Sequence, residues 1–286
     1  MYLQAEFSAT LSEHERTFSH LFHLDGDVYR LAPGRKTLRF FHDGSYYFLK
    51  VHTGVGWKEI VKNLLQLRLP VTSALTEWGA LHRLREVGID TVTPVGVGCE
   101  GRNPAHKKSF IITKDLGDTV TLEDLATRWK QGGIRTKSEI SFKRTLIYKV
   151  GTLTRTLHVN GVNHRDLYLC HLRILSKSLD TAVQPNNFKI YVMDLHRAQI
   201  RNRLPPERWI VKDLAGLLFS SMEVGLTRLD RLRFIRAYSG LPVRSALEGK
   251  GSFWRRVDRR ARRMYEKHSR RGFEDQPPST HSLGRG

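Results

Sequence analysis

The sequence has few cysteines, no long apolar run and no export signal, and each absence excludes a class of protein. Its two cysteines, Cys99 and Cys170, lie far apart in the chain, which argues against a disulfide framework or a zinc knuckle and favours two reduced thiols. No uninterrupted apolar stretch approaches the roughly 18–20 residues that cross a bilayer. The N-terminal residues lack a basic segment followed by an apolar one. We therefore expect a cytoplasmic protein with no signal peptide and no transmembrane segment.

Acidic residues are scarce relative to basic ones. The 286 residues include 48 Lys and Arg against 28 Asp and Glu, which gives a formal net charge of +20. A positive field of this size attracts polyanions and anionic surfaces. Nucleic acid, acidic lipid head groups, phosphorylated glycolipids and an acidic partner protein are therefore all candidate partners. The hydrophobic content of 40% is ordinary for a soluble protein, and the length is sufficient for two lobes.

The first part of the chain is predicted to form strands and one helix. The Asp43-Gly44 pair lies between aromatic and β-branched runs at 37–41 and 46–51, a pattern typical of a β-hairpin. The other elements predicted here are a helix from Thr72 to Gly88 and strands at 91–95 and 109–113.

The second part of the chain is predicted to be mainly helical. Helices are predicted from Thr121, at 142–159, at 207–238 and at 253–271, with short strands at 171–175 and 189–193. The last helix has an apolar stripe and arginines on its remaining surface. Such a helix either lies on an anionic membrane surface or docks on its own domain through the apolar stripe. The sequence leaves these two alternatives open.

Two aspartates in the second part are placed where phosphoryl transfer needs carboxylates. Asp166 ends the tetrad Asn163-His164-Arg165-Asp166 after a predicted helix, and Asp194 closes the apolar run at 189–193. In kinases one aspartate orients the attacking hydroxyl and another holds magnesium against the phosphates. Either residue alone would be read as a turn or capping aspartate. Together they predict a protein-kinase-like phosphotransferase, in which His164 and Arg165 brace the loop.

Lys50 and Glu77 complete this set upstream. Lys50 ends an apolar strand and Glu77 lies in the first turns of the following predicted helix. In kinases a strand lysine binds phosphate oxygens while a helix glutamate fixes its ammonium group. Each residue alone is typical of a protein surface, so the pair gains weight from the aspartates that follow in order. We predict Asp166, Lys50 and Glu77 as the catalytic residues.

The chain departs from the protein-kinase pattern at three points. His171 stands where such enzymes carry an asparagine on a second magnesium, and imidazole is a poor magnesium ligand. The second aspartate is followed by Leu195-His196 in place of Phe-Gly. No G-x-G-x-x-G motif precedes Lys50, and Gly54-Val55-Gly56 comes after it. The metal-site candidates are Asp194 and His171, and contact of His171 with metal is left open.

The predicted fold class is therefore α+β, a two-lobed protein-kinase-like fold with an antiparallel-sheet N-lobe and a mainly helical C-lobe. The N-lobe is assigned to residues 1–116 and the C-lobe to residues 117–286. The segment Lys114 to Asp118, which contains Gly117, is predicted to be the hinge. Asp115 and Leu116 in this hinge are predicted to contact the nucleotide.

A specific family shares these residues. The segments that carry the resemblance are GDVYR (26–30), GRKTLRF (34–40), YFLKVHTGVGW (47–57), NLLQLRLPV (63–71), EWGALHRLREVGIDT (77–91), SFIITKDL (109–116), GVNHRDLYLCH (161–171), MDLHRAQIR (193–201) and GLTRLDRLRFIRAY (225–238). They cover most of residues 26–240. The chain resembles the lipopolysaccharide core heptose(I) kinases of Gram-negative bacteria. His171 belongs to that family's pattern.

The resemblance implies transfer of the ATP γ-phosphate to the 4-hydroxyl of the first inner-core heptose. It implies ATP and Mg²⁺ as cofactors, Asp166 as the catalytic aspartate, Lys50 and Glu77 as the phosphate-anchoring pair, and Asp194 as the magnesium ligand. The acceptor would be a lipid-anchored, anionic saccharide at the cytoplasmic face of the inner membrane, which gives the net charge a rationale. The predicted acceptor-binding residues are Arg165, His196 and Arg197, with Lys58, Lys62, Arg68 and Arg201 as further candidates.

Three rival interpretations remain. A kinase-like enzyme acting on a protein or a small hydroxyl compound would share the same catalytic set. A basic nucleic-acid-binding module fits the charge, but the sequence has no zinc-finger spacing, RNP motif or basic zipper, so no nucleic acid is expected as a partner. A catalytically inactive kinase fold would not need all of Lys50, Glu77, Asp166 and Asp194.

Overall fold

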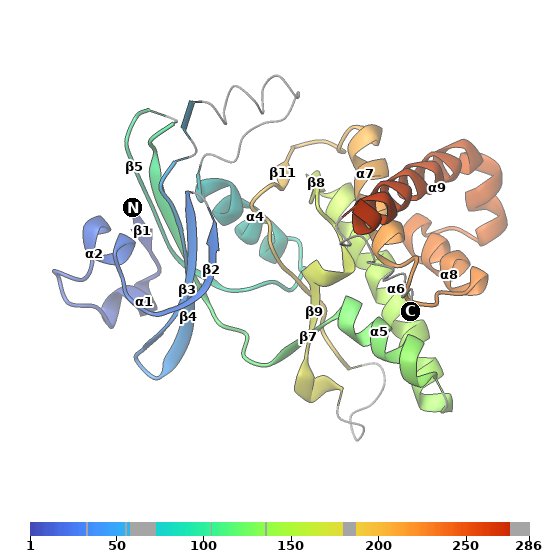
Figure 1. Ribbon diagram of the computed structural model, residues 1–286, viewed down its shortest axis with the longest axis horizontal. Coiled ribbons are helices and arrows are strands. Elements are labelled where there is room, and N and C mark those ends of the chain that lie inside the picture. The colour runs from blue at the N-terminus through green and yellow to red at the C-terminus, as the bar shows by residue number, and fades with distance from the viewer. Residues whose placement is uncertain are drawn as a thin grey trace, which may run out of the picture.

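The computed structural model describes residues 1–274 apart from 33, 55, 58–72, 104, 135 and 180–186, with side chains described up to Arg270. It has two parts (Figure 1). The N-terminal part is built on an antiparallel sheet, and the C-terminal part consists mainly of helices. Among the described residues, no helix is long and apolar enough to cross a membrane.

The N-terminal sheet is antiparallel throughout and runs in the order β1-β5-β6-β4-β3-β2. Its strands are β1 (Tyr2–Leu3), β2 (Asp27–Ala32), β3 (Arg35–His42), β4 (Ser45–His52), β5 (Pro94–Glu100) and β6 (Lys108–Lys114). Two short helices, α1 (Ala5–Ala9) and α2 (Phe18–Phe22), lie at the far side of the sheet from the C-terminal part (Figure 1). The hairpin predicted at Asp43-Gly44 is confirmed, and both turn residues have positive φ.

Alternation along the central strands gives the sheet two different faces. One face contributes Leu38, Phe40 and Leu49 to an apolar core that also holds Phe7 and Phe22 of the short helices. The opposite face carries Thr37 directly across from Lys50. Because side chains on one strand alternate between faces, the same pattern that builds the core aims Lys50 away from it.

Helix α4 (Leu75–Glu86) lies against this sheet and faces the C-terminal part (Figure 1). The predicted helix from Thr72 to Gly88 is thus confirmed in position, although residue 72 lies outside the described residues. Leu81 and Leu84 are buried, whereas Leu75, the first residue of the helix, is exposed. Gly88, with φ of 74°, follows the helix end as the sequence predicts.

The C-terminal part packs five described helices around three short antiparallel pairings. The helices are α5 (Leu122–Gly132), α6 (Lys137–Val159), α7 (Glu207–Ser220), α8 (Arg228–Ser239) and α9 (Val243–Glu274). The strands are β7 (Thr119–Thr121), β8 (Val162–Asn163), β9 (Leu172–Leu175), β10 (Tyr191–Val192) and β11 (Gln199–Ile200), paired as β10-β9-β7 and β11-β8. Thr121 caps α5 as predicted, accepting a hydrogen bond from the amide of Asp124.

The prediction of one helix at 207–238 is wrong, because this stretch forms α7 and α8. The break has two local causes. Gly225 adopts φ of 70°, a left-handed conformation outside the helical range. Thr227 then starts α8 through a capping box with Asp230. The predicted strands at 91–95, 171–175 and 189–193 are also displaced or shortened: β5 begins at Pro94, a 3-10 turn (Leu169–His171) precedes β9, and only Tyr191–Val192 forms β10.

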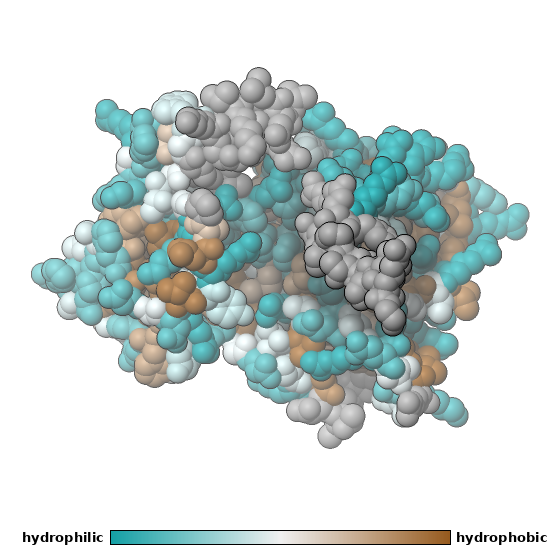
Figure 2. Space-filling model, viewed as in Figure 1, coloured by the Kyte–Doolittle hydropathy of each residue, from teal (hydrophilic) through white to brown (hydrophobic). Residues whose placement is uncertain are grey.

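The packing of helix α9 decides between the two alternatives left open for the basic C-terminal helix, membrane binding and docking on its own domain. Its residues Phe253, Val257 and Ala261 are buried together with Val211, Leu214 and Ala215 of α7. The apolar stripe is therefore packed inside the molecule, which is the docked alternative of the two. The arginines of α9 whose side chains the structure describes are exposed, and the region over α9 is largely hydrophilic on the face drawn in Figure 2.

Candidate active site

A cleft of about 730 Å³ lies between the N-terminal sheet and the C-terminal part. Its roof is formed by β2, β3 and β4, one side by the segment 115–119, and its floor by the residues around His171 and Asp194. The predicted residues Lys50, Glu77 and Asp194 all line it. Segments far apart in the sequence thus meet around one space.

Lys50 and Glu77 form an ion pair at the inner end of the cleft. The Lys50 ammonium lies 2.5 Å from Glu77 Oε1, and the Glu77 side chain is only 2% exposed. Burial would lower the pKa of Lys50, but the carboxylates of Glu77 and Asp194 raise it above the ordinary lysine value. Lys50 is therefore a fixed positive charge. The pair predicted from the sequence is formed in the structure.

Asp194 follows β10 and faces Lys50 across the cleft. Its backbone is in the left-handed region, with φ of 59°. One carboxylate oxygen is hydrogen-bonded to Nδ1 of His196, and the other lies 3.6 Å from Nε2 of His171. Burial would raise the pKa of Asp194, but His196, Lys50 and His171 hold it well below its usual range. The carboxylate is therefore ionised at any pH near neutrality.

Asp166 lies in the loop after β8, where Arg165 also adopts a left-handed backbone with φ of 72°. Arg197 Nη1 is 3.2 Å and 3.0 Å from the two oxygens of the Asp166 carboxylate. Lys212 Nζ lies 3.4 Å from one of the same oxygens. Two cations thus hold this carboxylate in a fixed position.

The Asp166 loop is anchored by Asp213, a residue that the sequence analysis missed. Asp213 is completely buried on α7. Its two oxygens accept hydrogen bonds from the amides of His164 and Arg165, each at 2.7 Å. His158 Nε2 lies 3.4 Å away and completes the surroundings. An acidic residue within the mainly apolar segment 210–219 of α7 was the signal in the sequence that could have identified it.

Two histidines tie the Asp166 loop to the Asp194 loop. The ring of His164 hydrogen-bonds the carbonyl of Met193 through Nε2 at 2.9 Å. The ring of His171 contacts the carbonyl of Asp166 through Nδ1 at 2.7 Å. Burial would lower the pKa of His171, but its contacts with Cys170, the Asp166 carbonyl and Asp194 raise it to about 9. The amide of Met193 also donates to the carbonyl of His171 at 2.9 Å, so the two loops share hydrogen bonds in both directions.

The segment predicted as a hinge borders the outer end of the cleft. Asp115 and Leu116 both line the cleft. The Asp115 carboxylate accepts bonds from Arg39 at 2.7 and 2.8 Å and from the amide of Gly117 at 2.9 Å. Gly117 has φ of 78°, so the turn after β6 uses the conformational freedom of glycine.

The predicted acceptor-binding residues occupy three different environments. Arg197 forms an ion pair with the Asp166 carboxylate, and His196 contacts the carboxylate of Asp194. Arg165 is 6% exposed, with its guanidinium 4.8 Å from the centre of the Trp209 ring. Arg201 bonds the side chains of Asn163 and Gln199. Lys58, Lys62 and Arg68 lie outside the described residues.

The donor set of the cleft fits a magnesium ion held jointly with a nucleotide. Among the described residues, no group of three or more His, Cys, Asp or Glu side chains is arranged to hold a metal alone. Magnesium is usually bound by one or two carboxylates together with substrate phosphates and water. The ionised Asp194 carboxylate, which lines the cleft near the Lys50 charge, suits that mode. No such fit is evident for His171, because nitrogen is a poor ligand for magnesium.

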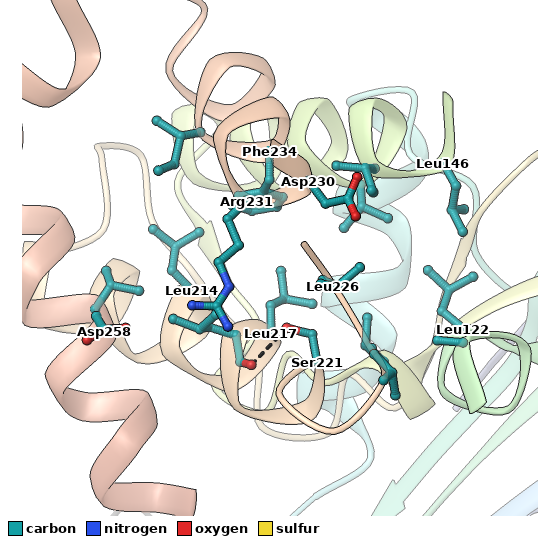
Figure 3. A pocket seen from close by; sticks show the side chains of 18 of the residues that line it. Leu122, Leu146, Leu214, Leu217, Ser221, Leu226, Asp230, Arg231, Phe234 and Asp258 are labelled. Carbon is teal, nitrogen blue, oxygen red and sulfur yellow. Dashed lines mark hydrogen bonds between the residues drawn. The ribbon is translucent and has the colours of Figure 1, made fainter. Parts of the chain in front are cut away.

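A second cavity, of about 210 Å³, lies within the C-terminal part and has a nearly apolar lining (Figure 3). Leu122 and Leu146 lie on one side, Leu214 and Leu217 on another, and Phe234 closes it from α8 (Figure 3). Helix α9 contributes Trp254, Val257 and Asp258 to the lining. The chemistry of this cavity is opposite to that of the cleft, because it offers apolar surface and few hydrogen-bonding groups.

Comparisons with known proteins agree with this geometry. Residues 19–238 match the model of the lipopolysaccharide kinase (Kdo/WaaP) family. The chain belongs to this family. It is 44% identical over 265 residues to the lipopolysaccharide core heptose(I) kinase WaaP of Escherichia coli K12, covering 93% of this chain and 97% of the relative. It is 43% identical over 249 residues to the protein of the same name from Pseudomonas aeruginosa PAO1, covering 87% and 90%.

A solved structure supports the fold. The chain matches a structure described as WaaP in complex with acyl carrier protein, with a TM-score of 0.75 and 37% sequence identity over 92% of this chain and 98% of that one. The family resemblance and the two-lobed α+β kinase-like fold predicted from the sequence are therefore confirmed, as is the enzyme class, a kinase that phosphorylates a hydroxyl group.

Proposed function

We propose that this kinase transfers the γ-phosphate of ATP to O-4 of the first heptose of the lipopolysaccharide inner core. The observation that carries the proposal is the meeting of the Lys50–Glu77 pair, Asp166 and Asp194 in and beside one cleft. It is supported by the names of relatives that are 43–44% identical over most of this chain. The proposal divides the chemistry among these four residues.

In this proposal Lys50 binds the phosphate oxygens of ATP. Its raised pKa keeps the ammonium charged, and Glu77 fixes its position by an ion pair of 2.5 Å. Phosphoryl transfer depends mainly on positioning and on stabilisation of charge that spreads over the phosphate oxygens. A cation with a fixed position supplies both. Asp115 and Leu116 at the edge of the cleft would border the nucleotide.

Asp166 would orient the attacking hydroxyl of the acceptor and accept its proton. Arg197 and Lys212 hold the carboxylate in place through ion pairs. A positioned base of this kind contributes typically 10²–10⁴ in rate. Asp213 fixes the loop itself through the amides of His164 and Arg165, so the direction of the Asp166 carboxylate does not depend on the acceptor.

Magnesium, when bound with the nucleotide, supplies neutralisation of the charge that develops on the phosphates. Asp194 is the residue that would hold it, since its carboxylate is ionised and lines the cleft. His196 orients that carboxylate through its Nδ1 contact. We propose that His171 orients Asp166 and Asp194 from its place between them.

The acceptor would approach from the side of Asp166, where positive charge is concentrated. Arg197 and Lys212 both lie on this carboxylate, and His196 lies near the other aspartate. An acceptor that carries negative charge would be attracted to these groups. Arg165 would act through the loop, since its guanidinium packs on Trp209. The net charge of +20 would favour a peripheral position on the anionic cytoplasmic leaflet of the inner membrane.

We also propose that the chain binds an acidic partner protein of the acyl-carrier type. Two observations favour this: the solved relative is described as a complex with acyl carrier protein, and the outer surface of α9 presents arginines such as Arg255, Arg259 and Arg263. Opposite charges steer association and set the binding register. The apolar cavity that α9 helps to line has the chemistry that an acyl chain requires.

The test of the main proposal is mass spectrometry of core oligosaccharide incubated with ATP, Mg²⁺ and the protein. We expect one added phosphate, which fragmentation locates on O-4 of the first heptose. Asp166→Ala should reduce product formation by at least about 10², whereas Asp25→Ala, an exposed aspartate outside the cleft, should leave it unchanged. A phosphate on another sugar would overturn the assigned acceptor, and full activity of Asp166→Ala would overturn the assigned role.

A further inference from the structure

The connection between β2 and β3, two strands that line the cleft, is short. Strand β2 ends at Ala32 and β3 begins at Arg35, so only Pro33 and Gly34 join them. In protein kinases the corresponding loop is rich in glycine and covers the nucleotide phosphates. Proline has no amide hydrogen, which leaves Gly34 as the one residue of this turn with a backbone donor. The chain therefore needs another source of hydrogen bonds for the phosphates.

Arg35 is the first residue after this turn and points into the cleft. It lies directly opposite His52 in the β3–β4 pairing, and Thr37 lies opposite Lys50. Residues two apart on a strand share a face, so Arg35 and Lys50 project from the same face of the sheet. Both line the cleft. Arg35 is thus placed above the Lys50–Asp194 centre.

The Arg35 guanidinium has no hydrogen-bond or ion-pair partner among the residues that the structure describes, in contrast to Lys50, Arg39 and Arg197. Lys50 is paired with Glu77, Arg39 with Asp115, and Arg197 with Asp166. Arg35 is half-buried, and burial lowers its pKa while Asp194 and Glu77 counteract part of that effect. A desolvated cation without a partner is costly, which indicates an anion that binds there.

We propose that Arg35 binds the phosphate chain of ATP and takes the place of the glycine-rich loop. Its planar guanidinium can donate two parallel hydrogen bonds to phosphate oxygens. Arg35 lies in the roof of the cleft, whereas Asp194 lies in its floor. The proposal rests on the nucleotide site proposed above. It adds a phosphate-binding residue that the kinase pattern does not contain.

The test is calorimetric titration of the protein with MgATP and, separately, with adenosine. We expect Arg35→Ala to weaken MgATP binding about 10- to 100-fold, in line with the loss of a charge-assisted bidentate contact. Adenosine, which has no phosphate, should bind within twofold of the wild-type affinity. Arg35→Lys keeps the charge but loses the planar fork, so its MgATP affinity should lie between those of wild type and Arg35→Ala. Arg102→Ala removes an exposed arginine of the loop between β5 and β6, outside the cleft, and should change neither titration.

Lys50→Ala separates this proposal from the site on which it rests. If Lys50→Ala loses MgATP affinity while Arg35→Ala binds MgATP within twofold of wild type, the role of Arg35 is wrong and the site stands. If both variants bind MgATP as wild type does, the nucleotide site itself is wrong. Equal losses for MgATP and adenosine in Arg35→Ala would also overturn the proposal, because the effect would not be specific to phosphate. Arg35→Lys provides the same test should Arg35→Ala fail to fold.

Discussion

Charged groups around the cleft and charged groups on α9 are organised in opposite ways. Near the cleft, the carboxylates of Asp213 and Glu77 are 0% and 2% exposed and each has defined partners. On α9, the pairs Arg244–Glu248 and Arg262–Asp258 are formed by side chains that are 40–88% exposed. The same residue types therefore serve two different purposes in one chain.

The difference shows how burial decides what a charge does. A buried carboxylate has left water, so its hydrogen bonds fix the backbone around it, and their loss leaves unsatisfied groups. An exposed pair exchanges one set of partners for water at little cost. The exposed arginines act instead at long range, by attracting anionic partners. Changes in the two regions should accordingly differ in size and in what they affect.

The largest effect is expected for Asp213→Ala. This change leaves the buried amides of His164 and Arg165 without acceptors and should lower the free energy of unfolding by about 3–5 kcal/mol. Phosphorylation should fall as well, because the Asp166 loop loses its anchor. Urea unfolding and a product assay measure the two effects. Asp213→Asn keeps one oxygen acceptor and should lie between Ala and wild type; equal stability of Asp213→Ala and wild type would show that the cleft charges are no different from those on α9.

An intermediate effect is expected from the protonation of His52. This buried side chain lies near Arg35 and Lys50, and burial together with these charges lowers its pKa to about 4. Above pH 6.5 the imidazole is neutral in both folded and unfolded chains. As pH falls from 6.5 towards 4, the unfolded chain takes up a proton that the folded one does not, so stability is lost.

His52→Gln removes that difference in proton uptake. The free energy of unfolding should therefore fall between pH 7 and pH 4.5 by about 2–3 kcal/mol more in the wild type than in the variant. Urea unfolding at several pH values, compared between the two proteins, isolates this residue from other titrating groups. Parallel curves for the two proteins would contradict the buried, neutral state of His52.

The smallest effect is expected for Arg256→Ala on α9. Arg256 pairs with Glu207, and both side chains are about half exposed. The free energy of unfolding should change by less than about 1 kcal/mol, and ATP binding should not change. The interaction with an anionic partner should weaken, more at low salt than at high salt because salt screens exposed charges. A loss of stability as large as that of Asp213→Ala would remove the contrast between the two regions.

The sequence predicted the fold and the central residues well, for identifiable reasons. Alternation along 37–41 and 46–51 predicted the hairpin that aims Lys50 into the cleft. Of the four residues predicted in order, Lys50, Glu77 and Asp194 line that cleft, and Asp166 lies beside it, in contact with His171. These features follow from the local sequence pattern of the strands and from the spacing of the charged residues along the chain. The roles of the four residues in catalysis remain predictions.

What the sequence missed depends on contacts between distant segments. Asp213 lies in a helix that was recognised by its apolar periodicity, and that periodicity says nothing about an aspartate. Its role follows only from its hydrogen bonds with the amides of His164 and Arg165. Lys212 gains importance only from its 3.4 Å contact with Asp166. The sequence prediction followed the apolar spacing along 207–238 and gave no weight to Gly225 and the Thr227 cap. These two residues divide the stretch into α7 and α8. Periodicity finds elements, but it does not show which polar residues bridge them.

The left-handed backbone of Arg165 and Asp194 has a consequence for the state of the protein before ligands bind. A non-glycine residue in this conformation costs roughly 1 kcal/mol or more. Arg165 directly precedes Asp166, and Asp194 is itself the second aspartate of the predicted site. The hydrogen bonds of Asp213, His164 and His171 keep both loops in that shape without help from a ligand. In the proposed mechanism the energy of ATP and acceptor binding is thereby left for the transfer itself, since the folding of the chain has already arranged the proposed catalytic groups.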